Sequence, residues 1–388
     1  MKRVETAIVI GGGIAGLTTA LALGRLGIDV KVFEQADSLR EVGAGLTVWS
    51  NGMYALDELG AAHDVLKAGQ VVESFRFLDE AGQVLGAVDL ARLERLVGQP
   101  SVTIHRRALL HALAQVLERT VSGCSIHLSE KFLRYRQEGG QVAAYFESGS
   151  VHEADILIGC DGFNSLVRKQ VLGDTDRNYS GYTCFRGVTE FPEAEIPRGA
   201  VWHTNGVGTQ FGLLHTGAGQ MAWYATANMP SGVIEDAGER KDYLLDRFGS
   251  FHELVPRLLG ATDSSAILKN DIYDRSPIYK WSDASVLLVG DAAHPTTPNL
   301  GQGACMALED AAVLGRAVKG GGSVEDIFDR FCKRRMRRTS FVTRSSRRAG
   351  AFNQSENQWL LKCRDKLTAA LFKGGSMPTI DKIMGYKI

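Results

Sequence analysis

The chain lacks an excess of charge of one sign, a long apolar run and a pair of closely spaced cysteines. Its 388 residues include 44 basic and 44 acidic side chains, so net charge gives no reason to expect a nucleic-acid partner. No apolar run reaches the roughly 18–20 residues that span a bilayer, and a predicted strand begins too early for a signal peptide. The six cysteines are scattered without a CxxC pair, which is typical of reduced thiols and gives no metal site. These features favour a cytoplasmic protein for which membrane contact is a minor alternative.

Residues 8–34, IVIGGGIAGLTTALALGRLGIDVKVFE, carry the strongest motif in the chain. An apolar strand ends in a glycine turn, an amphipathic helix follows, and a second apolar strand ends on Glu34. Gly11 allows the turn, Gly13 lets a pyrophosphate approach the backbone, and Gly16 lets the helix pack on the strand. The helix N-terminus offers N–H groups and partial positive charge to phosphates. Glu34 can accept hydrogen bonds from ribose hydroxyls and disfavours a 2′-phosphate, so the motif predicts FAD or NAD rather than NADP.

Two later strand-to-helix motifs extend this prediction. The first, residues 155–168 (DILIGCDGFNSLVR), runs from an apolar strand through Asp161 and Gly162 into a helix. The second, residues 286–311 (VLLVGDAAHPTTPNLGQGACMALEDA), places Asp291 at a strand end. There its carboxylate can accept hydrogen bonds from ribitol or ribose hydroxyls. The helix that begins at its Gly-Gln-Gly run would favour the negative charge of a reduced flavin.

In this order and spacing, the three motifs resemble those of the group A, single-component FAD-dependent aromatic hydroxylases. These are the para-hydroxybenzoate hydroxylase-like flavoprotein monooxygenases, and the resemblance covers about residues 5–350. The PNLGQGAC run at residues 298–305 is most similar to one subgroup. That subgroup holds zeaxanthin epoxidases, salicylate hydroxylase-like enzymes, FAD-dependent urate hydroxylases and bacterial quinolone or polyketide monooxygenases.

The resemblance implies an α/β fold with C-terminal helices. A Rossmann-like FAD-binding domain of the GR2 type would be interleaved with a substrate domain built on a mainly antiparallel β-sheet. Alternation of apolar and polar residues between 178 and 230 agrees with such a sheet. Helical patterns run from Thr103 to Leu117 and, as one long stretch, from Gly303 toward Ser346. The predicted segments are FAD-binding at 1–75, 101–177 and 276–320, substrate-binding at 76–100 and 178–275, and a C-terminal helical region at 321–388.

The resemblance also implies roles around the cofactor. Glu34 would bind the adenosine ribose and Asp291 the flavin ribitol, while Asp161 and Gly162 would serve FAD and NAD(P)H binding, partly through backbone geometry. Arg106 would contact the pyrophosphate side of FAD, with Arg107 as the alternative in register. The predicted cofactor site comprises Gly11, Gly13, Ile14, Ala15, Gly16, Glu34, Gln35, Gly45, Arg106, Asp161, Gly162, Asp291, Pro298, Gly301, Gly303 and Ala304.

Three further features allow more than one interpretation. Arg168 would contact a pyridine-nucleotide phosphate or brace its motif. His294 is favoured as a structural or flavin-adjacent residue over a catalytic base. The basic run at residues 333–338 is favoured as a helix face that covers apolar surface with its side-chain stems, over a membrane-binding or nucleic-acid-binding surface.

The candidates for the reaction site are Pro298, Asn299, Gln210 and His215. Pro298 matches the family residue that packs near the reactive side of the flavin, whereas a structural role is the alternative for His215. Gln210 and His215 fall on opposite faces of one predicted strand, and the sequence leaves open which face lines the substrate pocket. Candidates to line that pocket are Trp49, Asn51, Phe185, Arg186, Trp202, His203, Gln210, Phe211, Leu213, His215, Trp223, Tyr224 and Asn299.

As the resemblance implies, NADH or NADPH would reduce bound FAD, O2 would add to it, and the C4a-hydroperoxyflavin would transfer one oxygen atom to an electron-rich small molecule. The chain has no second GxGxxG, so the nicotinamide cofactor would bind only transiently. The loop at Gly43-Ala44-Gly45 would permit the flavin to move. The alternatives are a geranylgeranyl reductase-like oxidoreductase without oxygenation and a non-enzymatic flavin-binding protein. The protein would be a monomer or a homodimer.

Two departures from the family narrow the substrate class. Urate hydroxylases place an acid and an arginine where this chain has Asn299 and Thr209-Gln210, which disfavours a charged purine. The predicted strands between Val201 and Met229 contain no lysine or arginine, which disfavours a free aromatic carboxylate. A neutral planar molecule is therefore expected, such as a quinolone, a polycyclic aromatic or polyketide-like compound, or an isoprenoid.

Overall fold

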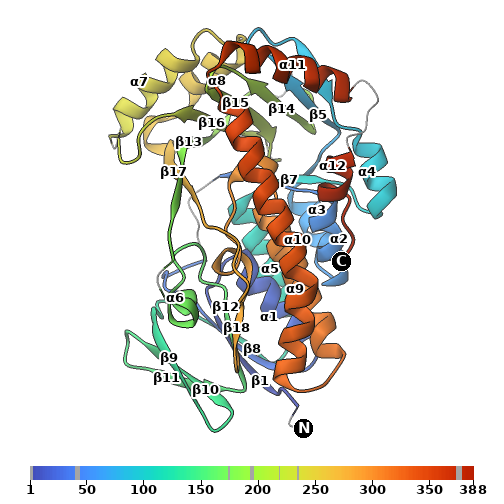
Figure 1. The fold of residues 1–388 in the computed structure, drawn as a ribbon, viewed down its shortest axis with the longest axis vertical. Helices are drawn as coiled ribbons and strands as arrows, with labels where there is room; N and C mark the ends of the chain where they lie inside the picture. Colours follow the sequence, from blue (N-terminus) through green and yellow to red (C-terminus); the bar gives the residue numbers. More distant parts are fainter. Residues whose placement is uncertain are drawn as a thin grey trace.

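The structure is a computed structural model that describes residues 3–39, 44–173, 175–192, 196–217, 219–233, 236–372 and 378–388. A mainly parallel sheet and a seven-stranded sheet occupy opposite ends of the elongated molecule, and helices lie between and beside them (Figure 1). The predicted α/β fold class is confirmed.

The parallel sheet forms the core of the half that contains the glycine turn. Its six strands lie in the order β18-β19-β12-β1-β2-β8, and all neighbours are parallel except β18 and β19. The apolar run of β1 is buried, and α1 packs between α5 and α9. The bounds are β1 Thr6–Ile10, β2 Asp29–Phe33, β8 Cys124–His127, β12 Ile156–Gly159, β18 Ser282–Asp283, β19 Val286–Leu288, α1 Ile14–Gly24, α5 Arg106–Thr120 and α9 Gly303–Lys319.

Two three-stranded sheets and four short helices surround this core. The strands pair in the orders β11-β10-β9 and β3-β7-β4, and every pairing is antiparallel. The bounds are β3 Gly45–Val48, β4 Gln70–Val71, β7 Val102–His105, β9 Phe132–Glu138, β10 Gln141–Phe146, β11 Val151–Ala154, α2 Ser50–Glu58, α3 Ala62–Ala68, α4 Leu90–Val97 and α6 Leu166–Leu172.

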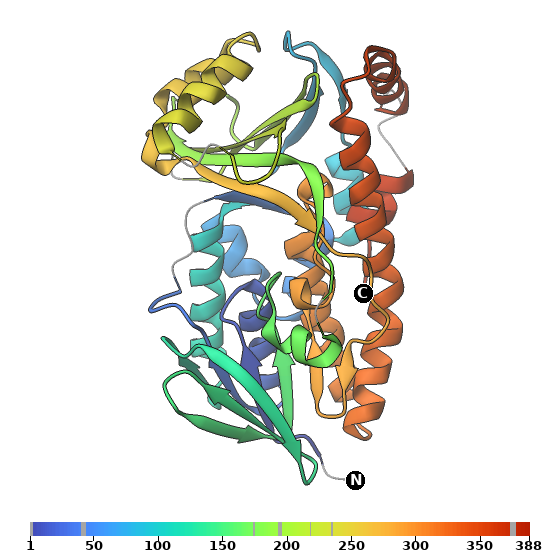
Figure 2. The same cartoon turned by 60° about the vertical axis from the view of Figure 1, so that its left-hand side comes forward.

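The seven-stranded sheet has the order β17-β13-β16-β15-β14-β5-β6 and is antiparallel except between β14 and β5. Helices α7 and α8 cover its outer face (Figure 2), and a second apolar core that includes Phe211 and Phe248 lies beneath them. The inner face looks toward the parallel-sheet half. The bounds are β5 Ser74–Leu78, β6 Val84–Ala87, β13 Asn178–Glu190, β14 Ala200–Asn205, β15 Thr209–His215, β16 Gln220–Asn228, β17 Leu268–Asp274, α7 Ala237–Phe248 and α8 Leu254–Ala261.

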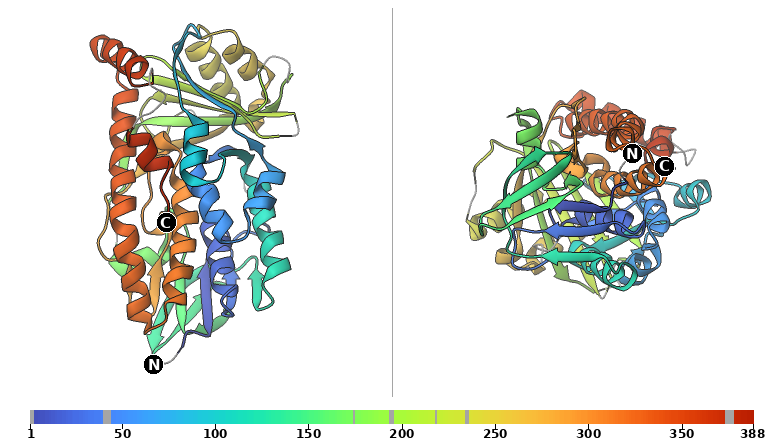
Figure 3. Two further views of the ribbon diagram at one scale, coloured as in Figure 1. Left: turned by 90° about the vertical axis from the view of Figure 1, so that its right-hand side faces the viewer. Right: turned by 90° about the horizontal axis from the view of Figure 1, so that it is seen from below.

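A long helix, α10 (Val324–Asn353), runs beside both halves (Figure 3) and is followed by α11 (Gln358–Phe372) and α12 (Pro378–Met384). Ser323 begins α10 with a capping box in which Asp326 takes part. Among the described residues, no helix is both long and apolar enough to cross a bilayer.

Two helix predictions were wrong at their boundaries. The stretch from Gly303 toward Ser346 is two helices, because Gly321 and Gly322 adopt left-handed backbone angles that end the first of them. The helix expected from Thr103 begins instead at Arg106, because residues 102–105 pair with β3 and β4 as a strand.

Candidate active site

A cavity of about 710 Å³ lies where the carboxyl ends of the parallel strands face the inner side of the seven-stranded sheet. Cofactors bind at this edge of open parallel sheets, and the volume suits a small-molecule site. All of the predicted cofactor residues line the cavity except Gly16, which lies behind the wall. Gly43, one of the three residues of the loop expected to permit movement of the flavin, lies outside the described residues.

The turn between β1 and α1 brings backbone to the cavity in a way that only glycine permits. Gly11 has φ +104°, and a Cβ there would lie 2.5 Å from the carbonyl oxygen of Cys160. A Cβ on Gly16 would lie 1.8 Å from the carbonyl oxygen of Gly11. Gly13 begins α1 without a side-chain cap, so the first N–H groups of the helix are available to an anion.

Glu34 is fixed across this turn by two backbone amides. Its Oε2 accepts a hydrogen bond from the amide of Gly12 at 2.7 Å, and its Oε1 accepts one from Ala36 at 2.9 Å. Each carboxylate oxygen keeps a further lone pair, so this side chain can still accept hydroxyl donors from a ribose.

Asp161 organises the start of α6. Its carboxylate accepts hydrogen bonds from the Ser165 hydroxyl and from the amides of Leu166 at 2.8 Å and Val167 at 3.1 Å. Burial raises the pKa of Asp161, and these hydrogen bonds oppose the rise. The contribution of Asp161 to the cavity is therefore mainly the shape of the turn.

Arg168 braces the third motif. Its Nη1 donates to the carbonyl oxygens of Ala292 and Ala293, each at 3.0 Å, which ties α6 to the loop that carries Asp291. Of the two interpretations left open by the sequence, this geometry matches the brace.

Three charged side chains come together in the cavity: Asp291 and Arg106 from the side of the three motifs, and Arg186 from β13 of the seven-stranded sheet. Asp291 is accessible from the cavity but enclosed by protein; this burial raises its pKa, whereas the charges of His294 and Arg106 lower it. Burial lowers the pKa of Arg106, which Asp291 raises and Arg186 lowers further. Arg106 lines the cavity and Arg107 is exposed outside it, so the geometry favours Arg106 in the open choice of register.

The N-terminus of α9 also faces the cavity. Gly301, Gly303 and Ala304 line the wall, and Gln302 begins the helix without capping it through its side chain. The helix dipole at this position favours negative charge on a bound group.

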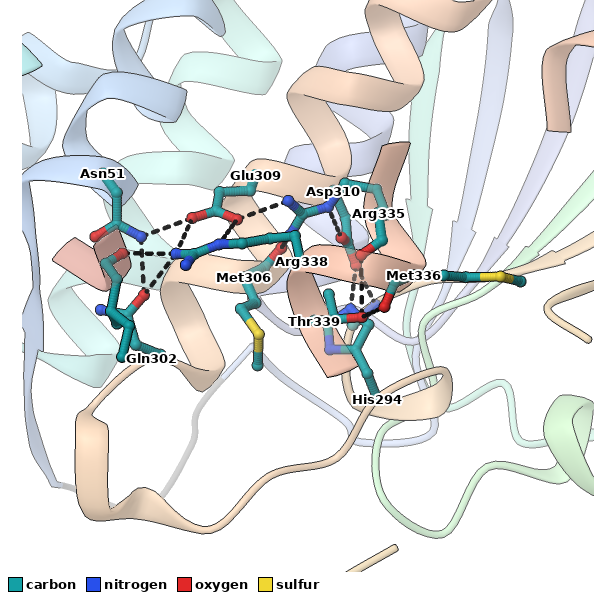
Figure 4. Close-up of polar contacts among 12 residues, drawn as sticks. Asn51, His294, Gln302, Met306, Glu309, Asp310, Arg335, Met336, Arg338 and Thr339 are labelled. Carbon is teal, nitrogen blue, oxygen red and sulfur yellow. Dashed lines mark hydrogen bonds and ion pairs between the residues drawn. The ribbon is translucent and has the colours of Figure 1, made fainter. Parts of the chain in front are cut away.

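A buried ion network holds α9 in place (Figure 4). Arg335 of α10 donates from Nη1 to Glu309 at 2.7 Å and from Nε to Asp310 at 2.6 Å, and all three side chains are fully buried. Arg338 reaches Glu309 at 3.1 Å, and Asn51 donates to both Gln302 and Glu309. Two members of the basic run are thus core ion partners, so its interpretation as a helix face over apolar surface was wrong for them.

His294 belongs to the same network and not to the cavity wall. Its Nε2 lies 2.6 Å from Asp310 Oδ2, and its ring packs against Trp281. Asp310 also accepts a hydrogen bond from the amide of Gly290, which positions the neighbouring Asp291. This agrees with the structural interpretation of His294.

The inner face of the seven-stranded sheet is the face of Gln210, and His215 points away from it. His215 Nε2 donates to the carbonyl oxygen of Ile196 at 3.1 Å within the outer core. The selection of His215 for the reaction site was therefore a wrong choice of face. Pro298 and Asn299 do line the cavity, and Asn299 accepts a hydrogen bond from Tyr182 at 2.7 Å.

The candidates on the sheet divide by these faces, except that Trp223 stacks on Phe211 in the outer-face core and also lines the cavity. The pocket candidates in the cavity wall are Trp49, Arg186, His203, Gln210, Trp223, Tyr224 and Asn299. Those elsewhere are Asn51 in the ion network and, outside the wall, Phe185, Trp202, Phe211, Leu213 and His215. Sequence reasoning missed Thr226 and, on α12, Ile380 and Met384, which also line the cavity. Alternation from Tyr224 could have found Thr226, whereas no motif marked α12.

Known proteins share this arrangement over most of the chain. Residues 3–183 and 272–346 match a protein-family model described as an FAD binding domain. The aurachin C monooxygenase/isomerase of Stigmatella aurantiaca is 37% identical over 367 residues, covering 95% of this chain and 94% of the relative. The chloroplastic zeaxanthin epoxidase of Nicotiana plumbaginifolia is 35% identical over 79% of this chain, which spans only 47% of that protein.

A solved structure of an FAD-containing protein has the same fold over nearly the whole chain. Klebsiella pneumoniae HpxO complexed with FAD and uric acid superposes with a TM-score of 0.89 at 27% identity, covering 98% of this chain and 97% of that one. The chain therefore belongs to the FAD binding domain family and, within it, to the FAD-dependent, aromatic hydroxylase-like monooxygenases.

Proposed function

We propose that this monooxygenase oxygenates a neutral, planar small molecule held between FAD and the inner face of the seven-stranded sheet, with NADH or NADPH as the reductant. The observation that carries the proposal is the division of charge within one cavity. Arg106 and Asp291 come from the side of the three motifs, and Arg186 on β13 approaches Arg106 closely enough to lower its pKa. The polar residues that β14, β15 and β16 present to the cavity, among them His203, Gln210 and Tyr224, are uncharged.

The residues on the motif side fit FAD. Gly16 packs closely against Gly11, and no side chain caps the start of α1, so a pyrophosphate would meet the free N–H groups there. Glu34 would accept ribose hydroxyls, and Asp291 would accept hydroxyls of the ribitol chain. Bound FAD supplies the electron transfer and the activation of O2.

The rest of the wall would orient the substrate and keep water out. Pro298 and Asn299 would position it beside the cofactor, and Gln210 would contribute to its polar contacts from the sheet. Ile380 and Met384 add apolar surface from α12 on another side. Excluding water in this way protects reactive intermediates from wasteful hydrolysis.

The relatives support small-molecule substrates of different kinds. One is named for aurachin C, others for zeaxanthin, and the HpxO structure contains uric acid. Gln210 and Asn299 are uncharged at the two positions where the urate hydroxylases have an arginine and an acid, so we favour a neutral ring compound over urate. We place the enzyme in the cytoplasm, where its six free thiols would stay reduced.

Flavin content and oxygen uptake test this function. The purified protein should bind FAD stoichiometrically, and a neutral quinolone should stimulate consumption of NADH or NADPH together with O2. Substrate conversion that continues undiminished without O2 would favour a reductase instead, and a protein that cannot be loaded with FAD would refute the proposal.

A further inference from the structure

Three residues form a row across the inner face of the seven-stranded sheet, and Arg186 on β13 continues this row beyond the third of them. His203 on β14 is paired with Gly212 on β15, and Gly212 is paired with Tyr224 on β16. A Cβ on Gly212 would lie 2.0 Å from Cε1 and 2.5 Å from the hydroxyl oxygen of Tyr224. The missing side chain therefore lets the tyrosine ring lie across β15, where its hydroxyl comes within 2.5 Å of His203 Nδ1.

The neighbouring row fixes the direction of this hydrogen bond. Burial lowers the pKa of His203 to about 4, so its ring is neutral near pH 7 and carries one N–H. Gln210 Nε2 lies 2.8 Å from His203 Nε2 and 3.2 Å from Asn205 Oδ1. His203 Nε2 also lies 3.2 Å from Asn205 Oδ1, but its 2.8 Å contact with the Gln210 amide nitrogen, which only donates, is the shorter. We therefore take His203 Nε2 as the acceptor and place the ring proton on Nδ1. That proton is donated to the Tyr224 oxygen.

The hydroxyl proton of Tyr224 is then left for a ligand. No second hydrogen-bond partner of this hydroxyl is found in the described part of the chain, and the residue lines the cavity. Burial raises the pKa of Tyr224, so the hydroxyl stays protonated. Thr226, two residues along the same face of β16, also lines the cavity, and its buried Oγ1 has no partner among the described residues.

We propose that Tyr224 donates a hydrogen bond to an uncharged ring oxygen of the substrate, a ketone carbonyl, and that His203 is its positioning residue. The inference rests on the proposed function and narrows its substrate class. A planar ring ketone satisfies the free donor, whereas a hydrocarbon ring or an isoprenoid without oxygen leaves it buried and unpaired, which costs binding free energy. The site therefore selects quinolone-type rings over oxygen-free compounds of the same shape.

Binding of two matched probes to the FAD-loaded protein tests this inference. The probes are 2-methyl-4(1H)-quinolone and 2-methylnaphthalene, which share a bicyclic frame but differ in the ring carbonyl and N–H. Calorimetric titration without NAD(P)H gives a dissociation constant for each. The wild-type protein should prefer the quinolone, and Tyr224→Phe should weaken quinolone binding about tenfold while changing naphthalene binding less than about twofold.

Two more variants separate a hydrogen bond from general damage. His203→Leu should weaken quinolone binding in the same selective way, and adding it to Tyr224→Phe should cause little further loss, because both act through one hydroxyl. Tyr179→Phe removes a hydroxyl that donates to the carbonyl of Met229, outside the cavity wall, and should leave both constants unchanged.

The outcomes distinguish this inference from the proposed function. The role of Tyr224 would be refuted if Tyr224→Phe weakened binding of both probes equally or of neither. It would also be refuted if the wild-type protein did not bind the quinolone more tightly than the naphthalene. FAD content and O2 consumption are measured separately on the same preparations. Loss of those activities in the wild-type protein would refute the proposed function, whatever the probes show.

Discussion

Replacing Arg335 with methionine should destabilise the protein about as much as breaking a buried ion pair does. The guanidinium is fully buried between Glu309 and Asp310 and also donates to the carbonyl oxygen of Met306 at 3.1 Å. Removing one partner of such a pair costs about 3–5 kcal/mol. Glu309 keeps Arg338 and Asp310 keeps His294, so we expect the low end, about 3 kcal/mol. For a chain of this length, that lowers the midpoint of thermal unfolding by about 4 °C.

The pH dependence gives this prediction its sign. Burial by itself raises the pKa of Glu309 and of Asp310, but the neighbouring positive charges more than reverse the rise, so both pKa values lie below normal. In the wild-type protein this stabilisation is complete above the unfolded pKa values of about 4 and is lost as pH falls through the lower folded values. Without Arg335 the pKa values of both carboxyl groups in the folded protein rise. Protonation at lower pH then removes the uncompensated buried negative charge, so the variant loses less stability there.

Differential scanning fluorimetry of FAD-loaded protein at pH 8 and pH 5 measures both effects. Arg335→Met should lower the midpoint of thermal unfolding, relative to the wild-type protein, by more at pH 8 than at pH 5. The exposed neighbour Arg334 supplies the control, since Arg334→Met should change stability by no more than about 0.5 kcal/mol. The network would not hold α9 as described if Arg335→Met left the unfolding midpoint unchanged at pH 8, or lowered it equally at both pH values.

Three further changes address the cofactor site. Gly16→Ala should abolish stoichiometric FAD binding, because its Cβ would lie 1.8 Å from the carbonyl oxygen of Gly11; the flavin-to-protein absorbance ratio after reconstitution measures this, and full occupancy would contradict it. Asp291→Ala should weaken FAD binding roughly tenfold or more by removing a carboxylate acceptor, as followed by flavin fluorescence titration, and unchanged affinity would show that the role is misassigned. Arg106→Met should weaken FAD binding while Arg107→Met should not, and equal effects in the two titrations would reopen the choice of register.

The cofactor side of the cavity was predictable because its information is local. A glycine turn, the acid after β2 and the Gly-Asp motif each encode their geometry within a few residues, and these residues meet at one sheet edge wherever parallel strands assemble. Resemblance to a family supplied Arg106, which no local pattern singles out.

The substrate side was less predictable because strand alternation defines two faces without saying which one is inside. That ambiguity placed His215 wrongly in the reaction site and left open whether Gln210 faces the cavity, which the packing of the whole sheet decides. The partners of Arg335 lie 25 and 26 residues away on another helix, so a basic run was interpreted as a surface feature. The row of His203, Gly212 and Tyr224 depends on the register of three strands, which no single segment reveals.

The most direct test of the account is the origin of the oxygen atom in the product. FAD-loaded protein, NADH or NADPH and a 2-alkyl-4(1H)-quinolone would be incubated under ¹⁸O2, and the product analysed by mass spectrometry. The account predicts a product in which the one newly added oxygen atom is ¹⁸O from O2, with no added oxygen from water. A product with oxygen from water, or one that forms equally well without O2, would contradict it.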